Sequence, residues 1–306
     1  MNSKNTTGTL QKQSNSENYV CYDPESPNKK FYVIRRTGTH AGLGTIVSYV
    51  LDGILYAIER NLIPVVDLQN QPNQYLTKDV LYKENAWEYY SRQPADYTLT
   101  DIYHSQNISL HEDNVKYGLW HNLLVCKSTE WLKCNRPLYK KHIIYNQTTK
   151  KYLIDDEVSI LQNKDKLLGV LCRGTDYLYK KPKNHARQPN PQDVLRYSEK
   201  VMQAKNCQYV FLATEDIDIY KQFKKHFGDR LLTKEQQRFS GQDLQDVQYL
   251  SALSFDKKLL GLQYLSVLNL LAKCHCFIGG LTAATPMVYL MTEGFEYEYV
   301  FDLGAY

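Results

Sequence analysis

Short apolar runs of strand length alternate along this chain with longer segments of helical periodicity. Phe31–Arg36 is a strand-like run, and it is followed by the glycine-rich turn Thr37–Gly44. Over Thr45–Arg60 apolar residues recur at helical spacing, and Ile63–Asp67 is again a strand-like run. Strands that alternate with helices favour a parallel sheet with right-handed crossovers. The chain is therefore predicted to be an α/β protein.

The same alternation returns in the second half of the chain. Strands are expected at Leu167–Cys172, Tyr209–Thr214, Leu231–Leu232, Cys276–Gly280 and Tyr299–Leu303, and helices at 193–204, 216–226, 258–273 and 286–292. Residues 70–150 show weak periodicity and predict only loops and short helices. We therefore predict two facing Rossmann-like domains with parallel sheets, over residues 28–155 and 156–306. A flexible tail rich in Asn, Ser, Lys and Gln is predicted at residues 1–27.

Composition limits the kinds of partner that the protein can bind and indicates the compartment in which it works. The chain has 306 residues and a formal net charge of +4, too little for a nucleic-acid-binding surface, so no nucleic acid partner is expected. No apolar run reaches about 18 residues, so no membrane-spanning segment is expected, and peripheral membrane contact is left open. The 7 cysteines include no C-x-x-C pair, which favours reduced thiols in a cytoplasmic protein without a metal site.

In folds of this kind ligands bind beyond the carboxyl ends of the strands. The first such place is the turn that holds His40, Gly42 and Gly44. Glycines let backbone N–H groups approach a ligand, and the following helix N-terminus adds partial positive charge. The turn can therefore form a phosphate or sugar cradle. The alternative is a tight turn that only packs the helix on the strand.

Two further turns complete the predicted site. At the second strand end Arg173 is followed by Thr175 and Asp176, and a guanidinium fork suits a diphosphate. Asp176 either orients Arg173 or accepts a proton; the alternative is an ion pair that only holds the loop. The third turn carries Gly280, Thr282 and Ala283 into a helix N-terminus, where Thr282 offers a hydroxyl donor.

A rival interpretation comes from the glycine pattern itself. Thr37–Gly44 matches short-chain dehydrogenases, Asp67 stands where a ribose-binding acid belongs, and Tyr177 and Lys181 imitate the catalytic pair. Against it, the first strand ends in two arginines, and Tyr177 and Lys181 are expected just after a strand rather than on a helix. An NAD(P)-dependent reductase is therefore the second hypothesis.

Four stretches together resemble the fucosyltransferase superfamily of GT-B glycosyltransferases, the α-1,2-, α-1,6- and protein O-fucosyltransferase group. They are the glycine loop and helix through Asp67, the NAWEYY segment at 85–90, the pair LGVLCRGTDY and YVFLATED, and LLAKCHCFIGGLTAA near the C-terminus. The resemblance implies an inverting transferase without a metal cofactor. The implied donor is a nucleotide sugar, GDP-fucose, and the implied acceptor is a glycan or lipid-linked saccharide in bacterial surface-glycan synthesis.

The resemblance also implies roles for residues at the three turns. Arg173 would hold the β-phosphate, Thr282 and its neighbours would contact the phosphates, and the loop from His40 to Gly44 would close over the donor. Two positions depart from the pattern: Leu171 stands where many members have His, and Ser266 stands where relatives place an acid for the guanine edge. Both departures bear on the choice of nucleotide.

The acceptor side and the base remain open in the sequence. Candidates for the base that accepts the proton of the acceptor hydroxyl are Asp176, His185, His40 and Glu88, in that order. Trp87, Glu88 and Tyr90 are expected to contact the acceptor, with a partly buried aromatic turn as the alternative. The lysines of Lys180–Lys183 attract an anionic acceptor or form a solvated loop. A non-catalytic nucleotide-sugar-binding protein is the third hypothesis.

Overall fold

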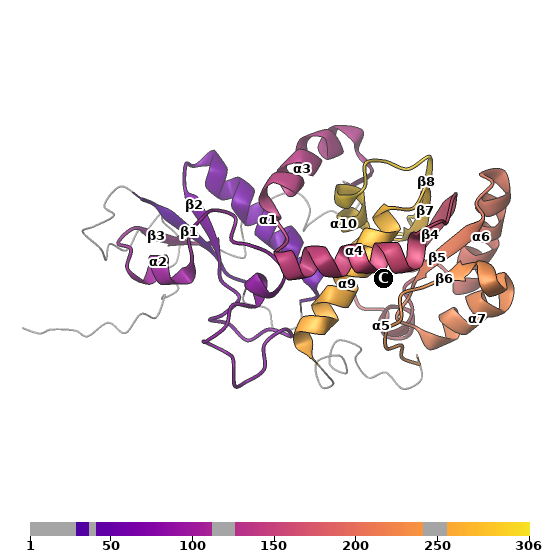
Figure 1. Cartoon of the computed structure of the whole chain (residues 1–306), viewed down its shortest axis with the longest axis horizontal. Helices are drawn as coiled ribbons and strands as arrows, with labels where there is room; N and C mark the ends of the chain where they lie inside the picture. Colours follow the sequence, from indigo (N-terminus) through magenta and orange to yellow (C-terminus); the bar gives the residue numbers. More distant parts are fainter. Residues whose placement is uncertain (1–28, 37–40, 112–125, 241–255) are drawn as a thin grey trace, which may run out of the picture.

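The first of two parallel sheets lies in the N-terminal half of the chain (Figure 1). The computed structural model describes residues 29–36, 41–111, 126–240 and 256–306, so the predicted tail lies outside the described residues. The strands of this sheet run in the order β2-β1-β3, and they are β1 (Phe31–Ile34), β2 (Ile63–Val66) and β3 (Ile108–Leu110). Helix α1 (Leu43–Glu59) connects β1 to β2, as the periodicity predicts.

The second sheet has five parallel strands in the order β6-β5-β4-β7-β8. They are β4 (Leu167–Leu171), β5 (Tyr209–Ala213), β6 (Leu231–Leu232), β7 (Cys276–Gly280) and β8 (Tyr297–Phe301). Its helices are α5 (Thr175–Lys180), α6 (Pro191–Ala204), α7 (Ile217–Phe227), α9 (Lys257–Ala272) and α10 (Ala284–Met291), with a short 3₁₀ turn, η4 (Gly228–Arg230). The predicted elements of this half are confirmed, with ends shifted by one or two residues.

Side-chain caps explain where two of these helices begin. The Asn190 side chain accepts a hydrogen bond from Gln192 N at the start of α6, where Pro191 occupies the first helical position. The Asp216 carboxylate accepts hydrogen bonds from the N–H groups of Asp218 and Ile219 at the start of α7. These caps place both helix starts directly after the carboxyl edge of the second sheet.

The region of weak periodicity contains more regular structure than the sequence predicts. It forms η1 (Ala86–Tyr89), α2 (Leu99–Tyr103), β3 and α3 (Thr129–His142), and α4 (Gln147–Leu161) begins at its end and continues beyond it. Strand β3 spans 3 residues, too few for an alternating pattern to be visible. The domain boundary expected near residue 155 lies inside α4, which packs along α9 of the second half.

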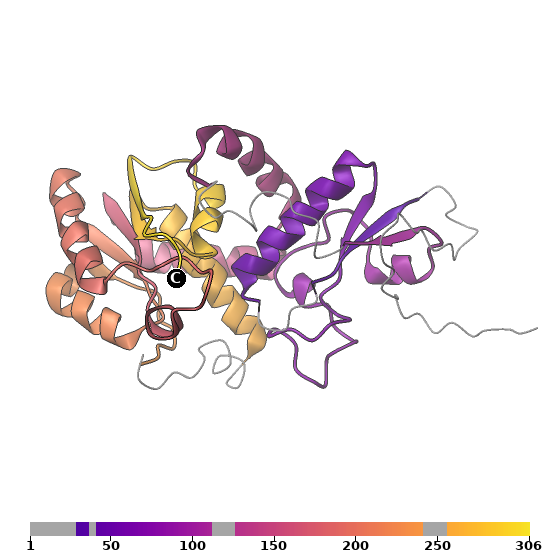
Figure 2. The ribbon, with the colours of Figure 1, turned by 180° about the vertical axis from the view of Figure 1, so that it is seen from behind.

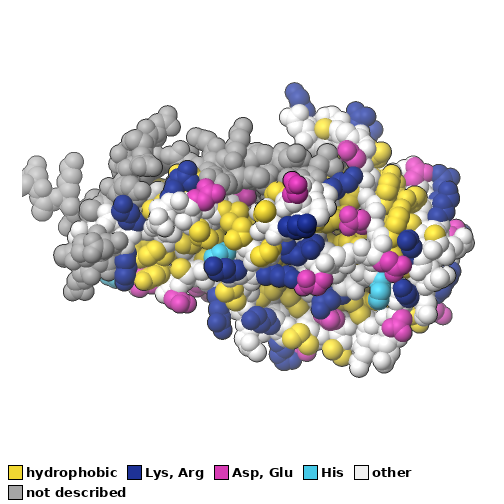
Figure 3. Space-filling model, turned by 90° about the horizontal axis from the view of Figure 1, so that it is seen from above, with side chains coloured by type: hydrophobic (Ala, Val, Ile, Leu, Met, Phe, Trp, Pro, Cys, Tyr) yellow, Lys and Arg dark blue, Asp and Glu magenta, His cyan; other side chains and the backbone are white. Residues whose placement is uncertain are grey.

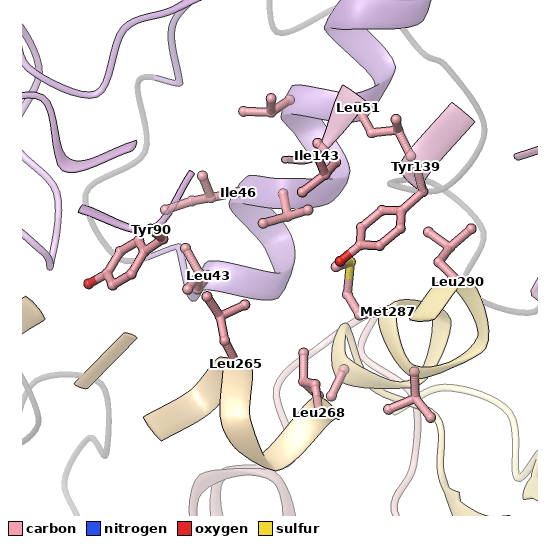
Figure 4. Close-up of a cluster of buried hydrophobic side chains, with 14 of the residues drawn as sticks. Leu43, Ile46, Leu51, Tyr90, Tyr139, Ile143, Leu265, Leu268, Met287 and Leu290 are labelled. Carbon is pink, nitrogen blue, oxygen red and sulfur yellow. The ribbon is translucent and has the colours of Figure 1, made fainter. Parts of the chain in front are cut away.

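A continuous apolar core joins the two halves (Figure 4). Leu43 of α1 faces Leu265 of α9, and Met287 of α10 lies beside Tyr139 of α3. Seen from behind, α1 runs close to both α9 and α10 (Figure 2). The two Rossmann-like units are therefore packed against each other through α1 of the first unit and α9 and α10 of the second. None of the helices that the structure describes combines the length and apolarity needed to cross a membrane.

Candidate functional site

The turn before α1 meets the turn after β7 directly. The hydroxyl group of Tyr264 on α9 lies against the Gly44 backbone, whose N–H lowers the pKa of that hydroxyl. A Cβ at Gly44 would overlap that hydroxyl and would lie 3.2 Å from the carbonyl oxygen of Ala283. Gly42 differs, since a Cβ there would have only Gln74 Nε2 nearby, at 3.9 Å. The absence of a side chain at Gly44 therefore lets two of the three predicted turns come together.

Arg173 leaves the end of β4, the central strand of the second sheet, toward this junction. Its Nε lies 3.3 Å from Glu215 Oε1, and its guanidinium lies 5.0 Å from the centre of the Tyr177 ring. Burial raises the pKa of the Tyr264 hydroxyl, and the Arg173 charge opposes that rise. The Arg173 charge thus acts at the place where the other two turns meet.

The turn that follows Arg173 is held by two acids at the end of β5. Glu215 Oε1 accepts hydrogen bonds from Gly174 N at 3.0 Å and from Thr175 Oγ1 at 2.8 Å. Asp216 Oδ2 accepts from Thr175 N at 3.1 Å. Thr175 has a φ of 48°, which is strained for a β-branched residue and persists only where the surroundings hold it.

Glu215 is a residue that the sequence prediction missed. Asp176 was expected to orient Arg173 or to accept a proton, and its side chain lies outside the part that the structure describes. Glu215 occupies the orienting position in the described part. A signal was present in the sequence, because Glu215 follows the apolar run at 209–214 at the same sheet edge as Arg173.

The turn after β7 is closed by its own hydroxyl groups. Thr282 Oγ1 accepts a hydrogen bond from Ala284 N at 3.2 Å, and Thr285 Oγ1 donates to Gly280 O at 2.7 Å. Gln188 covers this turn: its Nε2 donates to Leu281 O at 2.9 Å, and a Cβ at Gly280 would lie 3.1 Å from Gln188 Cδ. Glycine at 280 therefore lets Gln188 lie flat on the turn.

His185 comes near Arg173 through Tyr177. His185 Nδ1 lies 3.2 Å from the Tyr177 hydroxyl, and the two rings meet edge to face at 5.5 Å. Arg173, Tyr177 and His185 therefore form a row of contacts beside the junction. His40 lies outside the described residues, so its predicted place over the donor stays a prediction.

The three residues expected on the acceptor side lie in different surroundings. Trp87 is 1% exposed, and its indole N–H donates to Arg92 O at 2.8 Å, so neither ring face is open to solvent. Tyr90 is also buried, and its hydroxyl donates to Lys257 O at 3.0 Å, which ties η1 to α9. Glu88 is exposed and accepts from Gln93 Nε2 at 2.8 Å. Of the three side chains only that of Glu88 is exposed.

The structure bears on the dehydrogenase interpretation at Asp67. Both carboxylate oxygens are occupied: Oδ2 accepts from Arg35 Nε at 2.6 Å, and Oδ1 accepts from the backbone N–H groups of Gln69 and Asn70. A fully engaged, buried carboxylate has no oxygen left for a ribose. The prediction that Tyr177 lies just after a strand rather than on a helix is wrong, because Tyr177 lies on α5. Lys181 ends that helix with a φ of 46°, so the pair does not share a helical face.

Ser266, which stands where relatives place an acid for the guanine edge, points into the interior. It is fully buried, and its hydroxyl donates to Asp156 Oδ2 at 2.5 Å. Asp156 in turn pairs with Lys234 at 2.6 Å. This network ties α4, α9 and the segment after β6 together. Within the described ranges no cluster of His, Cys, Asp and Glu has the arrangement of a metal site.

Comparison with known proteins supports the fold through structures alone. No protein-family model and no curated protein matches the sequence. The fucosyltransferase NodZ from Bradyrhizobium superposes with a TM-score of 0.51 at 13% identity, over 87% of this chain and 94% of that one. NodZ co-crystallised with GDP gives 0.52 at 13% identity, over 87% and 93%. The POFUT1 apo-form gives 0.52 at 8% identity, over 90% and 98%. The chain thus has the fucosyltransferase-like GT-B fold, as predicted.

Proposed function

We propose that the protein is an inverting glycosyltransferase that works without a metal ion and takes its sugar from a nucleotide diphosphate donor. The position of Arg173 carries the proposal: it stands at the end of the central strand, held by Glu215, where the turns at Gly44 and Ala283 meet. GDP-fucose is the proposed donor, because the similarly folded NodZ has been soaked with GDP-fucose and co-crystallised with GDP.

The proposed reaction is a single displacement. The acceptor hydroxyl oxygen forms a bond to the anomeric carbon, and the bond from that carbon to the β-phosphate oxygen breaks. The electron pair leaves with the diphosphate, where negative charge develops. The Arg173 guanidinium can donate two charge-assisted hydrogen bonds to that group, and the N-terminus of α10 adds partial positive charge. Such preorganised cations supply the stabilisation that a metal ion provides elsewhere.

The proton of the acceptor hydroxyl needs a base. We assign His185 to this role, because the contact of its Nδ1 with Tyr177 orients the ring beside Arg173. Asp176, His40 and Glu88 are the remaining candidates. The acceptor is proposed to be a saccharide of surface-glycan synthesis, with Glu88 on its side of the site. A cytoplasmic location, with or without peripheral membrane contact, belongs to the same proposal.

Calorimetry with GDP, GDP-fucose, UDP and NADH, in buffer containing EDTA, tests the donor assignment. Wild type is compared with Arg173→Ala and with Arg173→Lys, which keeps the charge but loses the guanidinium fork. Loss of a charged hydrogen-bonding partner costs about 1.5–3 kcal/mol, roughly ten- to a hundredfold in affinity for GDP. Arg196→Ala is the matched control, because Arg196 is exposed on α6 and pairs with Asp193.

GDP binding that weakens in both Arg173 variants but not in the Arg196 variant supports the proposal. Binding of NADH alone, unchanged by Arg173→Ala, contradicts it. A transfer assay with GDP-fucose then separates an enzyme from a protein that only binds nucleotide sugars. The anomeric configuration of the product, read by NMR, tests inversion. His185→Gln should abolish transfer while GDP affinity stays within about twofold, since His185 contacts no proposed donor group.

A further inference from the structure

A strongly basic segment borders the candidate site. Residues 177–192 contain no Asp or Glu, yet they carry Lys180, Lys181, Lys183 and Arg187. These four exposed residues are called the basic rim here. Within the described ranges none of them forms an ion pair, although Arg187 lies 5.8 Å from the centre of the Tyr306 ring. Elsewhere basic and acidic side chains are interspersed, as on the face in Figure 3. None of the four side chains is thus held in an ion pair with a described acidic side chain.

The backbone that carries the basic rim is held in place. Lys181 ends α5 in a left-handed conformation with a φ of 46°. The following segment pairs with residues 304–306: Arg187 N donates to Gly304 O at 2.9 Å, and Tyr306 N donates to His185 O at 3.0 Å. Ala186 and Ala305 form an antiparallel bridge at the centre of this pairing. Only the long side chains remain to be ordered when an anion binds, which lowers the entropic cost of binding.

Both ends of the basic rim reach residues of the candidate donor site. Tyr177 lies one turn before Lys180 on α5, and its ring stacks on Arg173. Gln188 directly follows Arg187, and it covers the turn after β7 by donating to Leu281 O at 2.9 Å. The rim therefore begins one helical turn after Tyr177 and ends at the residue before Gln188. A ligand group bound there is separate from the diphosphate that Arg173 is proposed to hold.

We propose that the basic rim binds a phosphate or pyrophosphate group carried by the acceptor saccharide, which makes the acceptor of this enzyme anionic. The inference rests on the proposed function and specifies the substrate class of the same site. A neutral glycan gains no charge attraction from these four cations, whereas a phosphorylated sugar is attracted and oriented by them. Phosphate of this kind is present both on soluble sugar phosphates and on pyrophosphate-linked lipid saccharides.

Binding to GDP-loaded protein tests the inference at low and at physiological ionic strength. The probes are N-acetylglucosamine 1-phosphate, the uncharged methyl glycoside of N-acetylglucosamine, and polyprenyl-pyrophosphate-linked N-acetylglucosamine in neutral phosphatidylcholine vesicles. The test variant combines Lys180→Gln, Lys181→Gln and Lys183→Gln. The control variant combines Lys133→Gln, Lys141→Gln and Lys150→Gln, which remove the same charge from exposed residues of α3 and α4 that form no described ion pair.

We expect wild type and the control variant to prefer a phosphorylated probe over the methyl glycoside, with a preference that falls as salt rises. The test variant should lose about tenfold in affinity for that probe and keep its GDP affinity. Preference for the vesicle-borne probe alone identifies the lipid-linked source, and preference for both identifies the phosphate itself. Three outcomes overturn the inference. They are equal binding of charged and uncharged sugars, no binding of either phosphorylated probe, and a loss of GDP affinity in the test variant that matches its loss of affinity for the phosphorylated probe. If wild type does not bind GDP, the proposed function itself fails.

Discussion

Replacing Gly44 by alanine tests the contact between the first and third turns. A Cβ at this position overlaps the Tyr264 hydroxyl, and it lies 3.2 Å from Ala283 O and 3.4 Å from Tyr264 Cζ. Overpacking of this kind costs about 1–3 kcal/mol. Alanine inside a helix regains about 0.5–1 kcal/mol relative to glycine. The free energy of unfolding should therefore fall by up to about 2.5 kcal/mol.

A change at Tyr264 can remove the same overlap between Gly44 and the Tyr264 hydroxyl. Tyr264→Phe removes the hydroxyl that overlaps the new Cβ and leaves Cζ at 3.4 Å, an ordinary van der Waals distance. Alone it loses the polar contact of this hydroxyl with the Gly44 backbone, which is worth about 1 kcal/mol. In the double variant the overlap is gone, so its loss of stability should be about 1 kcal/mol smaller than the sum of the two single losses.

Urea unfolding of the four proteins measures this coupling, and calorimetry with GDP reports on the site. Gly42→Ala is the control, because the new Cβ would lie 3.9 Å from Gln74 Nε2 and the φ of Gly42 is −65°. It should change stability by less than about 0.5 kcal/mol. Two outcomes would show that glycine at position 44 is not required for the close approach of the turns. One is that Gly44→Ala is as stable as Gly42→Ala. The other is that the stability losses of Gly44→Ala and Tyr264→Phe simply add in the double variant.

Two further predictions concern the support of Arg173 and the acid stability of the fold. Glu215→Ala leaves Gly174 N and the Thr175 hydroxyl without their acceptor, so it should lower the free energy of unfolding by about 2–3 kcal/mol and weaken GDP binding about tenfold. Glu215→Gln keeps the accepting oxygen, so it should lose less stability in urea unfolding and less GDP affinity in calorimetry. Equal GDP affinity in wild type and both variants would contradict the assigned role. Burial lowers the pKa of His142, so its neutral form is favoured in the folded state. Its contribution to stability is complete above the ordinary histidine pKa of about 6.5 and is lost as the pH falls below it. The urea midpoint should therefore decrease from pH 7 to pH 5.5, and less steeply in His142→Gln; parallel slopes would exclude His142 as the cause.

The order of strands and helices could be predicted because it is a local property. The period of the apolar residues in Thr45–Arg60 and the run Leu167–Cys172 report which faces are buried, whatever they pack against. The caps at Asn190 and Asp216 are local as well, since each side chain bonds to N–H groups two or three residues on. The position of Arg173 at a sheet edge followed from the same pattern and from the rule for parallel strands.

The environment of each side chain could not be predicted in this way. Trp87 has the residue type of a sugar-stacking side chain, but packing around η1 places it in the core. Ser266 was aligned with a base-binding position, but α4 brings Asp156 against it and turns it into part of the interior. Trp87 lies within residues 70–150, whose path the sequence pattern did not define, and Asp156 lies on α4, a helix that the sequence did not predict.

The sequence by itself determined the α/β alternation, the three turns at strand ends and the presence of a single arginine at the central one. Only the tertiary structure decided that the turns at Gly44 and Ala283 touch, that Glu215 orients Arg173, and that His185 reaches it through Tyr177. The physical reason is the range of the forces involved. Periodicity and caps arise between residues a few positions apart, whereas these contacts join segments far apart in the chain and exist only after the core between α1, α9 and α10 has packed.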